Sequence, residues 1–121
     1  MPKKILVVDD DPDILLMLGA RLQSSGYEVR KVLNGDAALK AIESESPDLI
    51  LLDIMMPGME GNVLARTLKE SPRWKEIPVI FMTALRPPGK QQQAGARVGS
   101  NIVFSKPFEF SELLETIQTL L

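Results

Sequence analysis

The stretch Leu49-Ile50-Leu51-Leu52-Asp53-Ile54-Met55-Met56-Pro57-Gly58 decides the fold. Four aliphatic residues in a row are typical of a strand that is buried on both faces, as in a parallel sheet with helices on each side. Asp53 therefore lies at the carboxyl end of this predicted strand. Because ligands bind at that edge of open α/β sheets, Asp53 is a candidate for chemistry. The alternative explanation is that Asp53 only ends a strand and begins a turn.

Three other apolar runs end in polar residues in the same way, and each predicts a further buried strand. The carboxyl ends of parallel strands lie along one edge of a sheet, so residues far apart in the sequence converge there. We therefore expect further acids, a hydroxyl and an ammonium group to share this edge with Asp53. The three runs and the residues that follow them are 5–8 before Asp9 and Asp10, 77–82 before Thr83, and 102–104 before Ser105 and Lys106.

Strand and helix alternate five times along the chain with short connections. This is the pattern of an α/β fold with a doubly wound five-stranded parallel sheet, here flanked by five helices. The outer strand, with alternating charges, is predicted at 27–33. The segment 85–99 has helix breakers at both ends and almost no apolar stripe, so its helix should be short or loosely held. The predicted helices cover 12–25, a segment capped by Asn34 that continues through 36–43, 61–70, part of 85–99, and a last segment from Phe110 to Leu121.

Size and composition narrow the classes of function. The 121 residues, 45% of them hydrophobic, are enough for one domain with a single core. The net charge is −2 and no basic stripe occurs, which argues against direct binding of nucleic acid. The apolar run after Lys3 and Lys4 is too short for a signal peptide or a membrane span, so we expect a cytoplasmic protein. Without Cys and His, the chain lacks thiolate chemistry and the commonest general base.

The acids at the predicted edge favour a site for a cation and a phosphoryl group. Carboxylates about 4 Å apart repel by roughly 4 kcal/mol per pair at an effective dielectric near 20, so Asp9, Asp10 and Asp53 need a positive partner. Mg²⁺ takes hard oxygen ligands and is usually held by one or two carboxylates plus a phosphate. Lys106 and the Thr83 hydroxyl are suited to contact phosphoryl oxygens. A carboxylate such as that of Asp53 is a known type of phosphoryl acceptor.

With these residues in this order, the chain resembles the receiver domain of two-component response regulators, of the single-domain type related to chemotaxis regulators. The resemblance covers residues 1–121 as one domain. It implies a flavodoxin-like fold with strand order 2-1-3-4-5, and a phosphoprotein of a phosphorelay that catalyses only its own phosphorylation and dephosphorylation. The implied partners are a sensor histidine kinase or phosphotransfer protein and a downstream effector or output domain, with a homodimer expected on phosphorylation.

The resemblance also assigns roles to single residues. Aspartyl phosphate would form on the acceptor, and a conformational switch would follow through a nearby hydroxyl. By this resemblance Asp53 is the phosphoacceptor, Asp9, Asp10, Asp53 and the backbone carbonyl of Met55 hold Mg²⁺, Thr83 is the switch hydroxyl, and Lys106 contacts the phosphate.

Two other functions stay open on the sequence alone. Val103 stands where the family has an aromatic switch residue, which favours a pseudo-receiver that acts as a scaffold without phosphorylation. A haloacid-dehalogenase-like phosphatase also has an Asp-x-Asp motif directly after a strand, as at Asp9 to Asp11. Such enzymes need further acids later in the chain, but no Asp occurs after Asp53 and no cap domain fits. For Asp11 and Asp13, capping of the helix that begins at Pro12 is a sufficient explanation.

Overall fold

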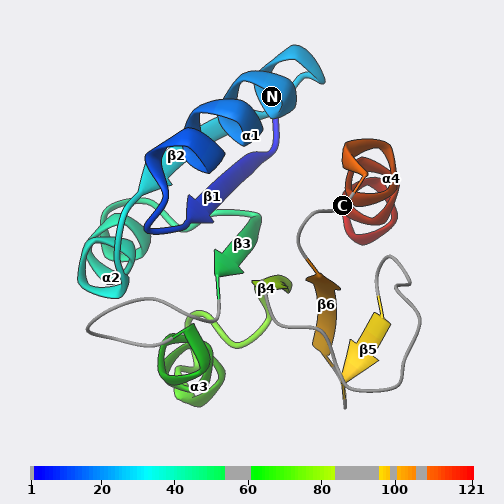
Figure 1. The fold of residues 1–121 in the computed structure, drawn as a ribbon. Coiled ribbons are helices and arrows are strands. Elements are labelled where there is room, and N and C mark those ends of the chain that lie inside the picture. The colour runs from blue at the N-terminus through cyan, green and yellow to red at the C-terminus, as the bar shows by residue number, and fades with distance from the viewer. Residues whose placement is uncertain (1, 54–60, 84–95, 99–100, 106–108) are drawn as a thin grey trace.

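The computed structural model describes residues 2–53, 61–83, 96–98, 101–105 and 109–121, which form one sheet between two layers of helices (Figure 1). The helices alternate with the strands along most of the described chain. The strands are β1 (Lys4–Val8), β2 (Glu28–Val32), β3 (Leu49–Asp53), β4 (Val79–Thr83), β5 (Ala96–Val98) and β6 (Asn101–Ser105). The helices are α1 (Pro12–Ser24), α2 (Gly35–Ser44), α3 (Gly61–Glu70) and α4 (Phe110–Leu120).

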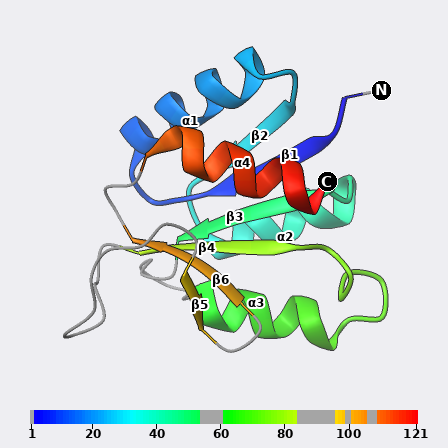
Figure 2. The same ribbon diagram turned by 90° about the vertical axis from the view of Figure 1, so that its right-hand side faces the viewer.

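The order of the strands is β2-β1-β3-β4-β6-β5. The first five of these pair in parallel, and β6 is the fifth parallel strand along the chain. The predicted order 2-1-3-4-5 is therefore confirmed. Figure 2 shows α1 and α4 together on one side of these strands.

The segment 85–99, predicted to hold a short or loosely held helix, is described only in part. Its residues 96–98 form β5, an antiparallel strand beside β6, and residues 84–95 lie outside the described part of the chain. The described residues hold four helices, and the fifth predicted helix falls largely on residues outside the described part of the chain. The strand β5 gains ladder hydrogen bonds from its neighbour β6.

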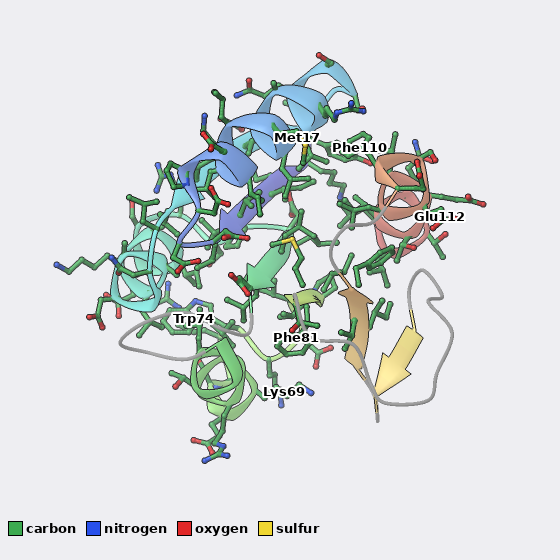
Figure 3. All side chains as sticks on the ribbon, viewed as in Figure 1. Met17, Lys69, Trp74, Phe81, Phe110 and Glu112 are labelled. Atoms are coloured by element: carbon green, nitrogen blue, oxygen red, sulfur yellow. The ribbon has the colours of Figure 1, made fainter. Side chains whose placement is uncertain are left out.

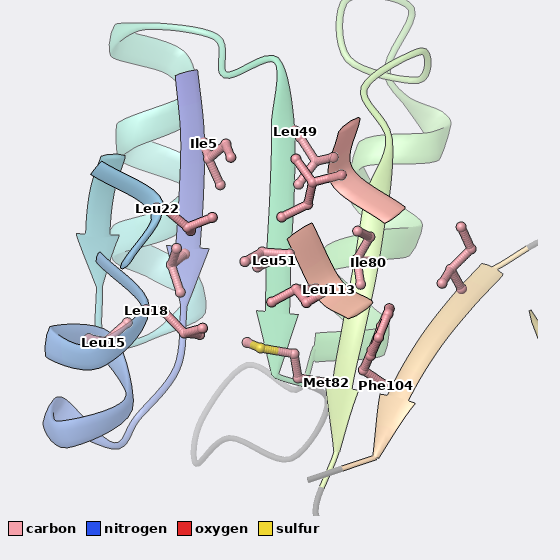
Figure 4. Packing of buried hydrophobic residues seen from close by; sticks show 13 residues of the cluster. Ile5, Leu15, Leu18, Leu22, Leu49, Leu51, Ile80, Met82, Phe104 and Leu113 are labelled. Carbon is pink, nitrogen blue, oxygen red and sulfur yellow. The ribbon is translucent and has the colours of Figure 1, made fainter. Parts of the chain in front are cut away.

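Two clusters of buried side chains fill the space on either side of the sheet. Residues along a strand alternate between the two clusters because successive side chains of a strand point to opposite faces. All five residues of β3 are buried, and for its four aliphatic residues this is what the sequence predicts. The cluster under α1 and α4 is drawn in Figure 4 and includes Ile5, Val7, Leu15, Leu18, Leu22, Leu49, Leu51, Ile80, Met82, Phe104, Leu113 and Ile117. The cluster under α2 and α3 includes Leu6, Val8, Ala38, Ile42, Ile50, Leu52, Leu64, Leu68, Trp74 and Phe81.

The ends of the first two helices follow the local sequence signals. Pro12 occupies the first turn of α1, and the Asp11 side chain accepts the Asp13 N–H. At α2 the Asn34 side chain accepts the Ala37 N–H at 2.8 Å, so the predicted cap is confirmed. After α1 the chain turns at Gly26, whose φ of +97° lies in the region that glycine adopts without strain.

The two helices of one layer also contact each other. The Arg21 guanidinium of α1 lies 5.4 Å from the ring centre of Phe110, the first residue of α4. Figure 3 shows the Phe110 side chain on the side of α4 that lies toward α1. None of the helices in the described ranges combines the length and the apolar character needed to cross a bilayer.

Candidate functional site

The site lies at the carboxyl edge of the parallel strands. Asp53 is the last residue of β3, and Asp9 directly follows β1, whose last residue Val8 is in register with Leu52. The registers of neighbouring strands therefore bring Asp9 and Asp53 to the same level. This is the edge predicted from the sequence.

The carboxylates of Asp9, Asp10 and Asp53 converge there. Carboxylate oxygens from all three lie within 4.8 Å of one another. Asp9 is fully buried, Asp53 is only 4% exposed, and Asp10 is exposed to solvent. Since burial raises the cost of unbalanced negative charge, this cluster is suited to a bound cation.

Backbone groups hold Asp9 on two sides. Its own N–H donates to the carbonyl of Val32, the last residue of β2, over 3.2 Å. The Asp11 N–H donates to Asp9 Oδ1 over 2.9 Å, and the Asp13 N–H in turn donates to Asp11 Oδ1 over 2.9 Å. The capping role expected for Asp11 is thus present, and its link to Asp9 is a contact that the sequence did not predict.

Thr83 is the last residue of β4 and is 6% exposed. In the register of β3 and β4, Asp53 lies opposite Met82, so Thr83 is one residue further along the neighbouring strand. The structure therefore places this hydroxyl residue at the same edge as the acids. Met55 and Lys106, the other two residues predicted for the site, lie outside the described residues.

The donor set fits Mg²⁺ as the implied metal. The three side chains offer only carboxylate oxygens, the hard ligands that Mg²⁺ prefers over the softer donors used by zinc or copper. Two of the acids are buried and one is exposed, so a cation could be held by protein oxygens while retaining water on the open side. The side chains at this edge are therefore suited to hold a hard divalent cation.

A family model for the response regulator receiver domain matches residues 5–118. The chain belongs to this family. The receiver domain is a phosphoacceptor signalling module of two-component systems, whose catalysis is confined to its own phosphorylation, and it implies a histidine kinase as partner. The acidic triad found at the sheet edge is typical of the magnesium site of receivers.

Several known proteins are similar over almost the whole chain. Response regulator PleD of Caulobacter vibrioides is 38% identical over 120 residues, which are 99% of this chain and 26% of PleD. The chemotaxis protein CheY4 of Vibrio cholerae is 33% identical with a TM-score of 0.85, and the match covers 100% of both chains. The response regulator TrrA of Thermotoga maritima, solved in complex with Mg²⁺ and BeF, is 35% identical with a TM-score of 0.80 over 98% of this chain and 99% of that chain.

The curated relatives are longer than this chain. It spans 26% of PleD and 53% of the phosphate regulon regulator PhoB of Rhizobium meliloti. The likeness to CheY4, by contrast, extends over a full chain of the same size. The shared part in every case is the receiver domain.

Proposed function

We propose that Asp53 accepts a phosphoryl group from the phosphohistidine of a sensor histidine kinase or a phosphotransfer protein. The observation that carries this proposal is the convergence of Asp9, Asp10 and Asp53 at the carboxyl edge of the sheet, with Asp53 at the end of a fully buried strand. A rigid strand end is suited to hold a nucleophile in one orientation, because positioning accounts for most of phosphoryl-transfer catalysis.

In the proposed step an oxygen of the Asp53 carboxylate attacks the phosphorus. A bond between that oxygen and phosphorus forms, and the bond between phosphorus and the histidine nitrogen breaks. The imidazole leaves with the electron pair of the broken bond, and the product is an aspartyl phosphate. With acetyl phosphate as donor, acetate is the leaving group.

Asp9, Asp10 and Asp53, together with the backbone carbonyl of Met55, would hold the metal. When bound, Mg²⁺ supplies positive charge that offsets the charge of the phosphoryl oxygens. The Mg²⁺ complex of TrrA supports this assignment. Asp9 would offer the metal a buried carboxylate that also accepts a hydrogen bond, and Asp10 would offer a carboxylate from the exposed side of the cluster.

The Thr83 hydroxyl and the Lys106 ammonium group would contact the phosphoryl oxygens. Each is a donor suited to an anionic oxygen, Lys106 as a point charge and Thr83 as a hydroxyl. A changed position of Thr83 after phosphorylation would then shift the population of conformations that a downstream effector or output domain binds. We further propose that residues 1–121 act as one receiver domain in the cytoplasm, with dimerisation on phosphorylation.

The direct test is the intact mass of the protein after incubation with acetyl phosphate. We expect the wild type to gain one phosphoryl group when Mg²⁺ is present and none when Mg²⁺ is chelated. Asp53→Asn should gain none under either condition. The matched control is Asp36→Asn, which removes one exposed carboxylate in the first turn of α2 and should be phosphorylated like the wild type.

A folded wild type that gains no phosphoryl group with Mg²⁺ and acetyl phosphate would contradict the proposal. If it also failed to bind beryllium fluoride, the pseudo-receiver would be the better description. Equal phosphorylation of Asp53→Asn and the wild type would instead show that another residue is the acceptor.

A further inference from the structure

We infer that Asp11 is a positioning residue for the metal site: by capping α1 it fixes the backbone N–H that holds the buried carboxylate of Asp9. This inference rests on the proposed Mg²⁺ site and concerns a residue outside its set of ligands. Asp11 is exposed, whereas Asp9 is fully buried. The contact thus joins the surface end of a helix to the interior of the site.

Asp11 makes hydrogen bonds through three separate groups. Its side chain accepts the Asp13 N–H at 2.9 Å, and its carbonyl accepts the Leu15 N–H at 3.2 Å. Its own N–H donates to Asp9 Oδ1 at 2.9 Å. The first two contacts hold Asp11 against the first turn of α1. Through the third contact, the Asp9 carboxylate is bonded to a group whose position is fixed by the helix.

The backbone of Asp11 is restricted by its neighbour as well. It has φ −95° and ψ 109°, which is an extended conformation. The following Pro12 disfavours the helical region for the residue before it, so an extended Asp11 is the expected conformation. Cap and proline together direct the Asp11 N–H toward the β1 end, where Asp9 lies.

A hydrogen bond to one carboxylate oxygen restricts how the carboxylate rotates. Groups that orient a metal ligand in this way affect metal affinity although they do not touch the metal. The backbone N–H of Asp9 donates to the Val32 carbonyl of β2, and its side chain accepts the Asp11 N–H at Oδ1. The Asp11 N–H therefore contributes to the orientation of the Asp9 carboxylate.

The competing explanation is that Asp11 acts only through its charge. The two explanations predict different results for conservative variants, because Asn and Ser cap helices about as well as Asp but carry no charge. Asp11→Asn and Asp11→Ser therefore keep the cap, and Asp11→Ala removes it. Asn34→Ala is a matched control, because it removes the same kind of cap from α2 at a residue outside the cluster.

The experiment measures the Mg²⁺ dissociation constant of each folded variant by isothermal titration calorimetry. We expect Asp11→Ala to weaken Mg²⁺ binding on the order of tenfold, the low end for loss of a group that orients a metal ligand. Asp11→Asn and Asp11→Ser should stay within about threefold of the wild type, as for loss of one exposed charge. Asn34→Ala should bind Mg²⁺ like the wild type.

A second readout needs no metal. In chelator, hydrogen exchange of the Asp11 amide should be slow in the wild type and faster in Asp11→Ala. Wild-type affinity in Asp11→Ala, or an equal loss in Asp11→Ala and Asp11→Asn, would overturn the inference while leaving the metal site intact. A wild type that binds no Mg²⁺ but protects the Asp11 amide would overturn the proposed function instead, and with it any role of Asp11 in metal binding.

Discussion

At the scale of single residues, Lys4 connects three elements at the end of the sheet opposite the acids. Its ammonium group lies 2.9 Å from Glu45 Oε2, just after α2. Its backbone N–H donates to Asp48 Oδ2 at 2.7 Å, and its carbonyl accepts the Asp48 N–H at 2.8 Å. The hydrogen bond from Lys4 lowers the pKa of Glu45, and the same bond raises the pKa of Lys4.

These pKa shifts predict how the contribution of the pair to stability depends on pH. Because the Glu45 pKa is lowered on folding, the contribution is present above its ordinary value of about 4.3 and is lost as pH falls through the folded value. Because the Lys4 pKa is raised, the contribution is also lost as pH rises through the folded value of Lys4.

The measurement is urea unfolding of wild type and Glu45→Gln at several pH values. We expect Glu45→Gln to be the less stable protein near neutral pH, and the difference to vanish at acid pH, where Glu45 is protonated in both states. A difference that is independent of pH would contradict this account of the pair.

At the same scale, part of the proposed site could be predicted from the sequence. Asp9, Asp10, Asp53 and Thr83 could be placed at one edge because each follows an apolar run, and strand ends converge in a parallel sheet. The contact between Asp11 and Asp9 could not be predicted. A capping signal in the sequence locates the end of a helix, but it does not say which group accepts the N–H of the capping residue. The site roles themselves stay predictions.

At the scale of elements, the helices differ in how their N-termini are capped. Asp11 and Asn34 cap α1 and α2 with their side chains. The corresponding residue of α4 is Glu109, whose backbone is extended but whose side chain makes no capping hydrogen bond. The first turn of α4 therefore lacks a contact that a shorter side chain would supply.

We expect Glu109→Ser to raise the free energy of unfolding by about 1 kcal/mol, because serine is a preferred capping residue. Glu112→Ser is the matched control, since it removes an exposed acid in the first turn of α4 without creating a cap. Urea unfolding gives both values. An equal effect of the two substitutions would show that charge, and not capping, is responsible.

Also at this scale, the parallel strands were predictable and β5 was not. Runs such as Leu49–Leu52 are continuous and apolar, so they indicate a strand buried on both faces. The residues of β5 lie in a segment without periodicity, where helix and strand cannot be told apart by pattern. Its pairing with β6 depends on a neighbour, which local propensity does not contain.

At the scale of the whole molecule, three carboxylates meet within 4.8 Å of one another, and their mutual repulsion opposes folding. Carboxylates about 5 Å apart repel by roughly 3 kcal/mol at an effective dielectric near 20. A ligand that binds only the folded state then stabilises it in proportion to the logarithm of its concentration. The stability of the protein should therefore be linked to Mg²⁺.

This linkage predicts that the effect of Asp53→Asn on stability depends on Mg²⁺. In chelator we expect the variant to be more stable than the wild type by about 1 kcal/mol or more, because one repelling charge is removed. In excess Mg²⁺ the advantage should shrink or reverse, because the variant binds the cation more weakly. Thermal unfolding with and without Mg²⁺ checks both. A wild type with the same melting temperature in the presence and absence of Mg²⁺ would contradict the linkage.

The most direct measurement identifies the residue that carries the phosphoryl group. After phosphorylation with acetyl phosphate and Mg²⁺, borohydride reduces an aspartyl phosphate to homoserine, and tryptic peptides are then sequenced by mass spectrometry. Trypsin separates the candidates, because Asp53 falls in peptide 41–66 and Asp9 and Asp10 fall in peptide 5–21. We predict homoserine at position 53 alone. Homoserine at position 9 or 10, or at no position in a phosphorylated sample, would contradict Asp53 as the acceptor.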